Sequence, residues 1–159
     1  VSIEGKTASL FATSARIGAL VAGHDATVVD ALTNYGTSFG MVFQIVDDIL
    51  DVIATDAEIG KRAGHDMEEG VYTLPVLLTL AQQSSDTDEL RSFLGKPLSQ
   101  TERERALAIV RTHSGIQSAI ESAKNYVHMA EAECNLMPQG VATDALRAAP
   151  AALLASIIR

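Results

Sequence analysis

The amino-acid sequence predicts an all-α protein that folds as a helical bundle. Apolar residues recur at helical spacing along most of the chain, and the alternation of apolar and polar residues that marks a half-buried strand does not persist anywhere. Aromatic residues make up only 4% of the sequence and Trp is absent, a composition that suits packed helices better than a β-sandwich. The length of 159 residues is enough for one domain with a sizeable core, so residues 1–159 are expected to form a single all-α domain.

The first third of the chain predicts two helices followed by a loop. Residues 4–23 form the first helix, which ends at its closing glycine. A second helix begins near Asp25, whose side chain can cap it. It either stops at about Asn34, with a glycine as interruption, or continues through to Ala54. The polar, glycine-rich residues 55–75 predict a long loop with room for one turn of helix.

The remainder of the chain predicts further helices. They are expected at 75–83, 87–94, 99–112 and 114–136, with a last helix that closes the chain after Pro138 and Gly140. Ser99 followed by Glu102 is a capping box at the start of one of them. The long helix 114–136 is amphipathic, with an apolar stripe formed by Ile116, Ile120, Ala123, Val127, Ala130 and Cys134.

Charge and cysteine content narrow the possible functions. The formal net charge is −8 and no basic run occurs, which argues against nucleic acid and anionic membranes as partners. Cys134 is the only cysteine, so an internal disulfide is impossible and a Cys-based zinc site is disfavoured. No signal peptide and no apolar run of about 18 residues is visible. These features predict a cytoplasmic protein.

The stretch "FGMVFQIVDDILDVIA", residues 39–54, places acidic residues inside an otherwise apolar helix. Gln44, Asp47, Asp48 and Asp51 stand at i, i+3, i+4 and i+7 and therefore share one narrow stripe. Like charges at this spacing destabilise a helix by a few tenths of a kcal/mol, and burial of unpaired charges costs far more. A stripe that faces a polar cavity holding cations removes this difficulty, and carboxylates with substrate phosphates are the ligands that Mg²⁺ prefers.

Other interpretations of these residues remain open at this point. The stripe is also compatible with a solvated acidic face, whereas the spacing of an EF-hand loop is absent and adjacent helix turns do not suit the carboxylate pair of a glycosidase. Gly36 and Gly40 indicate either close helix–helix approach or room for a slender apolar substrate. The "GKT" at residues 5–7 lacks the glycine-rich turn and preceding strand of a P-loop.

Four segments in order resemble one known family. "GKTASLF", "FQIVDDILD", "GKRAGHDMEEGVYTLPVLLTL" and "SGIQSAIESAKNYVHMAEAECNLMP" are similar to motifs of the trans-type polyprenyl diphosphate synthases, and the resemblance extends over essentially the whole chain. "FQIVDDILD" resembles the second aspartate-rich motif of that family. The resemblance implies the isoprenoid-synthase fold, of which this chain would form the C-terminal half.

The resemblance also implies a Mg²⁺ site on the aspartate helix. Asp47 resembles the principal metal-ligating aspartate of the second motif. Asp48 and Asp51 are implied to support it through hydrogen bonds and metal-bound water. One departure concerns the loop that follows, where the family usually has a lysine that reaches the phosphates and this chain has Val71. One cationic contact to a diphosphate is therefore expected to be missing.

The same resemblance assigns roles to five further residues. Lys6 resembles the lysine that binds the allylic diphosphate, and Lys61 resembles a second diphosphate-contacting lysine. Thr7 and Gln44 are similar to the polar lining beside the developing carbocation. Asp66 matches an aspartate that orients the loop and its metal-bound water.

The implied activity is Mg²⁺-dependent head-to-tail condensation of an allylic diphosphate with isopentenyl diphosphate by a homodimeric prenyltransferase. Family members are roughly twice as long and carry a first aspartate-rich motif, which this chain lacks. The chain is therefore expected to supply one half of the site, to need the N-terminal half as partner, and to be inactive alone. The alternatives are a non-catalytic subunit that regulates a complete synthase and a simple acidic interaction module. Product chain length is left open.

Overall fold

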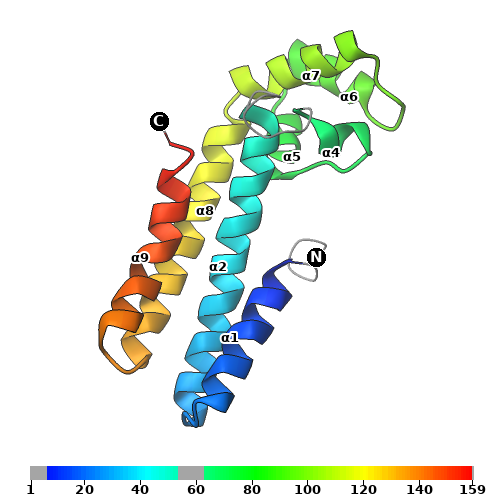
Figure 1. Ribbon diagram of the computed structural model, residues 1–159. Helices are drawn as coiled ribbons and strands as arrows, with labels where there is room; N and C mark the ends of the chain where they lie inside the picture. Colours follow the sequence, from blue (N-terminus) through cyan, green and yellow to red (C-terminus); the bar gives the residue numbers. More distant parts are fainter. Residues whose placement is uncertain (1–6, 54–62, 159) are drawn as a thin grey trace. The chain divides into compact units, whose positions relative to one another are not determined.

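The computed structural model describes residues 7–53 and 63–158, and every regular element within them is a helix (Figure 1). The all-α prediction is confirmed. The elements are α1 (Ser9–Val21), α2 (Ala26–Ile53), α4 (His65–Glu68), α5 (Leu74–Leu80), α6 (Ser85–Phe93), α7 (Gln100–Thr112), α8 (Gly115–Glu133), the 3₁₀ helix η2 (Cys134–Leu136) and α9 (Val141–Ala155).

The helix boundaries follow the local signals closely. The second helix continues through Gly36 without interruption, because tertiary packing compensates for the low helix propensity of glycine. The capping box of Ser99 and Glu102 at the start of α7 is confirmed. A second capping box, in which Ser84 and Thr87 bond reciprocally, starts α6 two residues earlier than expected. The preceding helix α5 ends at Leu80 and not at Gln83, and Ser84, which caps α6, is extended.

The chain packs into two compact units. Unit 1 comprises residues 1–46 and 122–159, and unit 2 comprises residues 47–121. The helices α2 and α8 each contribute residues to both units. The expectation of a single domain over the whole chain stays a prediction.

In unit 1, α1 lies against α2 at two glycines (Figure 1). A Cβ atom at Gly36 would lie 2.7 Å from the carbonyl oxygen of Phe11, and one at Gly40 would lie 2.7 Å from the Cα of Ala8. Backbone atoms of α1 and of the residue before it thus occupy the space that a side chain would need. The close-approach interpretation of the two glycines is confirmed, and the room that was the alternative interpretation is filled by α1.

A second contact in unit 1 joins Tyr35 of α2 to a carbonyl group of α9. Pro150 is buried inside α9 and has no N–H group, so it cannot donate to the carbonyl of Leu146 one turn earlier. The hydroxyl of Tyr35 donates to that carbonyl oxygen at 2.8 Å. Burial, followed by the nearby Cys134, raises the pKa of Tyr35 to about 12, so the hydroxyl stays protonated as this bond requires. Tyr35 therefore satisfies the polar group that the proline exposes.

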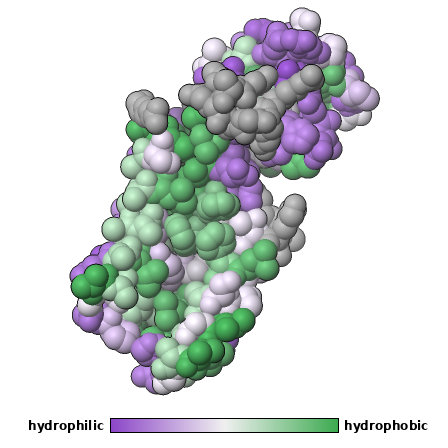
Figure 2. All heavy atoms as spheres, viewed as in Figure 1, coloured by the Kyte–Doolittle hydropathy of each residue, from purple (hydrophilic) through white to green (hydrophobic). Residues whose placement is uncertain are grey.

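Unit 2 is a small helical unit around an aliphatic core. Its buried residues come from the end of α2, from α4 to α7 and from the segment before α4: Val52, Ala63, Met67, Val76, Leu90, Ala106, Leu107, Ile109 and Val110. Gly64, in the left-handed conformation with φ of 74°, packs directly on Leu107. On the face in Figure 2, hydrophilic residues dominate the surface of the α6–α7 part of this unit, whereas much of the unit 1 surface is hydrophobic. Among the described residues, no helix has both the length and the apolar character needed to cross a membrane.

Substitution of Gly36 or Gly40 by Ala is expected to lower the free energy of unfolding by about 1–3 kcal/mol, because the added methyl group would overlap the backbone of α1. Gly18 provides the matched control, since it lies within α1 and a Cβ atom added there would have no other atom within 4 Å. Gly18→Ala should raise the free energy of unfolding by up to about 1 kcal/mol. Urea unfolding followed by circular dichroism measures all three. Equal effects at Gly18 and Gly36 would contradict the packing argument.

Tyr35→Phe is expected to lower the free energy of unfolding by about 1–3 kcal/mol, because it leaves the Leu146 carbonyl without its donor. In a Pro150→Ala background the restored N–H group can donate to that carbonyl, so Tyr35→Phe should then cost less. A double-mutant cycle measured by urea unfolding checks the coupling. Additive effects of the two substitutions would show that the hydroxyl does not compensate for the proline.

Candidate functional site

The candidate site begins with the aspartates of α2, which the uninterrupted helix keeps at the predicted spacing. Their environments differ. The side chain of Asp47 is exposed, whereas Asp48 and Asp51 are only 1% and 4% exposed. The three carboxylates therefore do not face one common open cavity within the described part of the chain, and their chemical roles must be considered one at a time.

The side chain of Asp48, on α2, contacts the start of helix α5. Its Oδ2 accepts a hydrogen bond of 3.4 Å from the backbone N–H of Leu74, the first residue of α5. The residue before it, Thr73, makes no side-chain cap, so Asp48 supplies an acceptor at the positive end of that helix. This structural contact was not foreseen from the sequence, because the two residues are 26 positions apart. The supporting metal role of Asp48 stays a prediction.

The end of α2, around Asp51, is closed by residues that come later in the sequence. The N–H of Gly64 donates to the carbonyl oxygen of Asp51 at 2.8 Å. The Nε of Arg111 donates to the carbonyl oxygen of Val52 at 2.7 Å. Sequence reasoning missed Arg111, since a basic residue in the last turn of a polar-faced helix normally signals only a solvated side chain.

Asp47 provides the carboxylate best suited to bind a cation. No hydrogen bond or ion pair to its side chain occurs within residues 7–53 and 63–158, so the carboxylate is open to solvent. The same described ranges hold no cluster of three His, Cys, Asp or Glu side chains that could enclose a metal ion. A single accessible carboxylate is still a suitable donor for Mg²⁺, which retains water ligands and binds through one or two carboxylates and the phosphates of a substrate.

Thr7 and Gln44 are brought together in unit 1. The hydroxyl of Thr7 donates to Oε1 of Gln44 at 2.6 Å, although the residues are 37 positions apart. This contact depends on the packing of α1 against α2 at the two glycines. Both side chains are partly buried, so they form a small fixed polar pair on an otherwise apolar helix contact. The prediction that both belong to one polar lining agrees with this proximity, and their role beside a carbocation stays a prediction.

The predicted diphosphate-binding residues are placed only in part. Lys6 and Lys61 lie outside the described residues. Asp66 lies in α4 and is half-buried, and its carbonyl oxygen accepts a hydrogen bond of 2.8 Å from the N–H of Val71. Val71 is 53% exposed, so an apolar side chain stands in solvent where the resembling family usually has a cation. Burial therefore does not account for the valine at this position.

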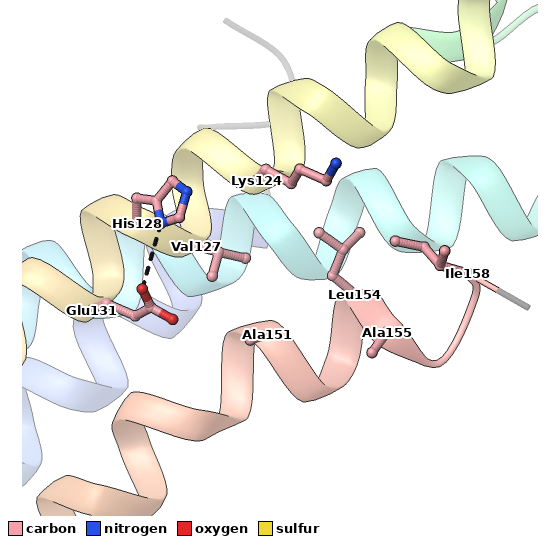
Figure 3. Close-up of a pocket in the computed structure, with 8 residues that line it drawn as sticks. All are labelled: Lys124, Val127, His128, Glu131, Ala151, Leu154, Ala155 and Ile158. Atoms are coloured by element: carbon pink, nitrogen blue, oxygen red, sulfur yellow. Dashed lines mark hydrogen bonds and ion pairs between the residues drawn. The ribbon is translucent and has the colours of Figure 1, made fainter.

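A groove that the sequence did not indicate lies between α8 and α9 in unit 1 (Figure 3). It has a volume of about 250 Å³, and Val127, Leu154 and Ile158 contribute to its apolar lining. His128 and Glu131 stand together on α8 at its edge, with 3.5 Å between Nδ1 and Oε2. None of the residues predicted for the site lines this groove.

Comparisons with known proteins agree with the arrangement of motifs. Residues 2–110 match the family model described as Polyprenyl synthetase. The chain is 42% identical over 130 residues to the geranylgeranyl diphosphate synthase of Saccharolobus solfataricus, a match that covers 80% of this chain and 39% of that protein. It is 33% identical over 146 residues to the heptaprenyl diphosphate synthase component 2 of Bacillus subtilis, covering 92% of this chain and 41% of the relative.

Solved structures give the same result for the fold. The geranylgeranyl pyrophosphate synthase of Corynebacterium glutamicum, in complex with calcium and isoprenyl diphosphate, superposes with a TM-score of 0.88 at 34% identity. That match covers 98% of this chain and 48% of the other. The heptaprenyl diphosphate synthase of Staphylococcus aureus superposes with a TM-score of 0.89 at 29% identity, covering 96% and 48% of the two chains. The chain spans less than half of the length of these relatives, and it belongs to the polyprenyl synthetase family.

Proposed function

We propose that this chain supplies the second aspartate-rich half of a Mg²⁺-dependent polyprenyl diphosphate synthase site. The reaction is head-to-tail condensation of an allylic diphosphate with isopentenyl diphosphate. The observation that carries the proposal is the exposed carboxylate of Asp47 on α2, within the "FQIVDDILD" segment of a chain that belongs to the polyprenyl synthetase family. The relatives' names include geranylgeranyl and nonaprenyl diphosphate synthases, so the product length for this chain is not part of the proposal.

Asp47 is the residue proposed to hold the cation, with Asp48 and Asp51 behind it. When bound, Mg²⁺ supplies positive charge that lowers the barrier to departure of a diphosphate. Asp47 is accessible and brings one hard oxygen donor to that ion. Asp48 and Asp51 are buried. We propose that they orient the helix and the water ligands of the ion and do not coordinate the ion directly. Lys6 and Lys61 are proposed to hold the phosphate oxygens.

The chemical step divides between the two substrates. The bond from the allylic carbon to oxygen breaks, and its electron pair leaves with the diphosphate. The double bond of isopentenyl diphosphate then forms the new carbon–carbon bond, and a proton passes to the released diphosphate. Gln44 carries an amide dipole that can stabilise the allylic cation, and the hydrogen bond from Thr7 fixes the orientation of that amide. The apolar residues around this pair help to keep out water, which would otherwise capture the cation.

Because the chain spans less than half of its relatives, we propose that it acts together with the other half of the fold. A cation bound at one accessible carboxylate keeps its hydration, and the stabilisation of a leaving group is then weak. A hybrid enzyme tests this part of the proposal. In the hybrid, this chain replaces the segment that it matches in the geranylgeranyl diphosphate synthase of Saccharolobus solfataricus.

The chain alone is expected to be inactive, whereas the hybrid should incorporate radiolabelled isopentenyl diphosphate into an allylic diphosphate primer. Circular dichroism of both proteins serves as the control for folding. Incorporation by the chain alone would contradict the need for a second half. A helical hybrid that incorporates no label would instead favour the alternative of a non-catalytic regulatory subunit.

In the hybrid, Asp47→Asn is expected to lower kcat on the order of 100- to 1,000-fold or more, because it removes the carboxylate proposed to hold the cation that stabilises the departing diphosphate. Its free energy of unfolding should change by less than about 0.5 kcal/mol, since the side chain is exposed. Asp48→Asn, in contrast, should lower the free energy of unfolding, because Asp48 is buried and its side chain bonds to α5.

Asp30→Asn is the matched control for this prediction. Asp30 lies on the same helix and is exposed, and its carboxylate pairs with Arg16 of α1. The substitution should leave both kcat and the Mg²⁺ dependence of the hybrid unchanged. Steady-state kinetics at saturating Mg²⁺ measures the three variants, and normal turnover in Asp47→Asn would remove this residue from the metal site.

A further inference from the structure

Helix α7 carries three arginines that reach different parts of unit 2. Arg105 forms an exposed ion pair with Glu89 of α6, with 2.6 Å between Nη2 and Oε2. Arg103 and Arg111 instead donate to backbone carbonyls on the two sides of the segment that follows α2. Three residues of one type on one helix thus have distinct partners, and two of them act at the end of the aspartate helix.

Arg111 closes the end of α2 directly. The last carbonyl groups of a helix have no partner within the helix, and Val52 is one of these positions. α2 has no basic residue in its own last turn, and Asp47 and Asp51 place negative charge near the negative end of its dipole. The guanidinium of Arg111, 2.7 Å from the Val52 carbonyl oxygen, supplies both a donor and the missing positive charge.

Arg103 contacts the same helix end indirectly, through the backbone of Ala63 and Gly64. Its Nη1 donates to the carbonyl oxygen of Ala63 at 3.1 Å, and the next residue, Gly64, donates its N–H to the Asp51 carbonyl oxygen at 2.8 Å. Arg103 is 6% exposed and pairs with Glu68 of α4, with 3.3 Å between Nε and Oε1. A buried charge of this kind requires its partners, so the geometry around Ala63 is strongly constrained.

We propose that Arg103 and Arg111 are positioning residues for the aspartates of α2. Arg111 binds a carbonyl of the helix end, and Arg103 holds the Ala63 carbonyl next to Gly64, whose N–H binds the Asp51 carbonyl. Together they set the axial position and rotation of the last turns of α2, and with these the direction in which Asp47 projects. Groups behind a metal ligand commonly control affinity by orienting it. Neither arginine is proposed to touch substrate or metal. The inference rests on the proposed function in so far as Asp47 binds the cation.

The first test uses the chain without metal. Native-state hydrogen exchange compares backbone amides of residues 49–53 with those of α6. Loss of a charge-assisted hydrogen bond in Arg111→Gln should accelerate exchange at residues 49–53 by about 10-fold or more, with α6 little changed. Arg105→Gln, on the same helix, is the matched control and should affect α6 only. Equal acceleration of both regions by Arg111→Gln would mean a general loss of stability and would overturn the proposal.

The second test measures the Mg²⁺ response of the hybrid enzyme. Arg111→Gln should raise the half-saturating Mg²⁺ concentration by about 10- to 100-fold, with kcat at saturating Mg²⁺ affected much less. Arg111→Lys keeps the charge and should recover part of the response, and Arg105→Gln should have none of these effects. An unaltered Mg²⁺ response would overturn the positioning role. Failure of Asp47→Asn to reduce turnover would overturn the proposed function instead, so the two failures are distinguishable.

Discussion

The structure depends on how the end of α2 accommodates carboxylates at the least favourable place in a helix. Aspartates near a helix C-terminus oppose the dipole and repel one another, and two of them are also buried. Hydrogen-bond donors from outside the helix stabilise these groups. The N–H of Leu74 contacts Asp48, and Gly64 and Arg111 take up the backbone carbonyls at the helix end. The arrangement of α4, α5 and α7 in unit 2 can be understood as the set of partners that this helix end requires.

The aspartates of α2 differ in accessibility: Asp47 is exposed, whereas Asp48 and Asp51 are buried. A carboxylate that already contacts backbone donors inside a packed unit contributes to the geometry of the helix, whereas one in solvent is available to a cation. The difference between Asp47 and its neighbour Asp48 arises from one step of about 100° around the helix, which turns one side chain outward and the other toward α5. The acidic motif thus contains residues that stabilise the geometry of the helix and one residue, Asp47, that is available to bind a ligand.

Unit 1 depends on close contact between two helices. Gly36 and Gly40 let the backbone of α1 approach α2, and that approach brings Thr7 to Gln44. The ring of Phe11 packs beside Phe39 and Phe43 at centroid distances of 5.4 and 5.3 Å, which fixes the rotation of the two helices. The Tyr35 hydroxyl adds a directional contact between α2 and α9.

The sequence by itself determined the helical class, most helix boundaries, the capping box of Ser99 and the spacing of the aspartates on α2. These features depend on local propensity, periodicity and neighbours within one or two turns. The close approach at Gly36 and Gly40 was one of two interpretations that the sequence allowed. Only the tertiary structure decided between them, because the deciding atoms belong to Ala8, Phe11 and Ala12, which are distant from both glycines along the chain.

The tertiary structure alone also decided which aspartate is accessible and which residues close the helix end. A period of 3.6 residues places Asp47, Asp48 and Asp51 on one stripe but cannot state what covers each part of that stripe. The contacts from Leu74 to the Asp48 side chain and from Arg111 to the Val52 carbonyl join residues 26 and 59 positions apart, and nothing in the local sequence marks Leu74 or Arg111 as a contact of α2. Periodicity reports the direction of a side chain around its own helix, whereas burial and hydrogen bonding depend on what the rest of the chain packs against it.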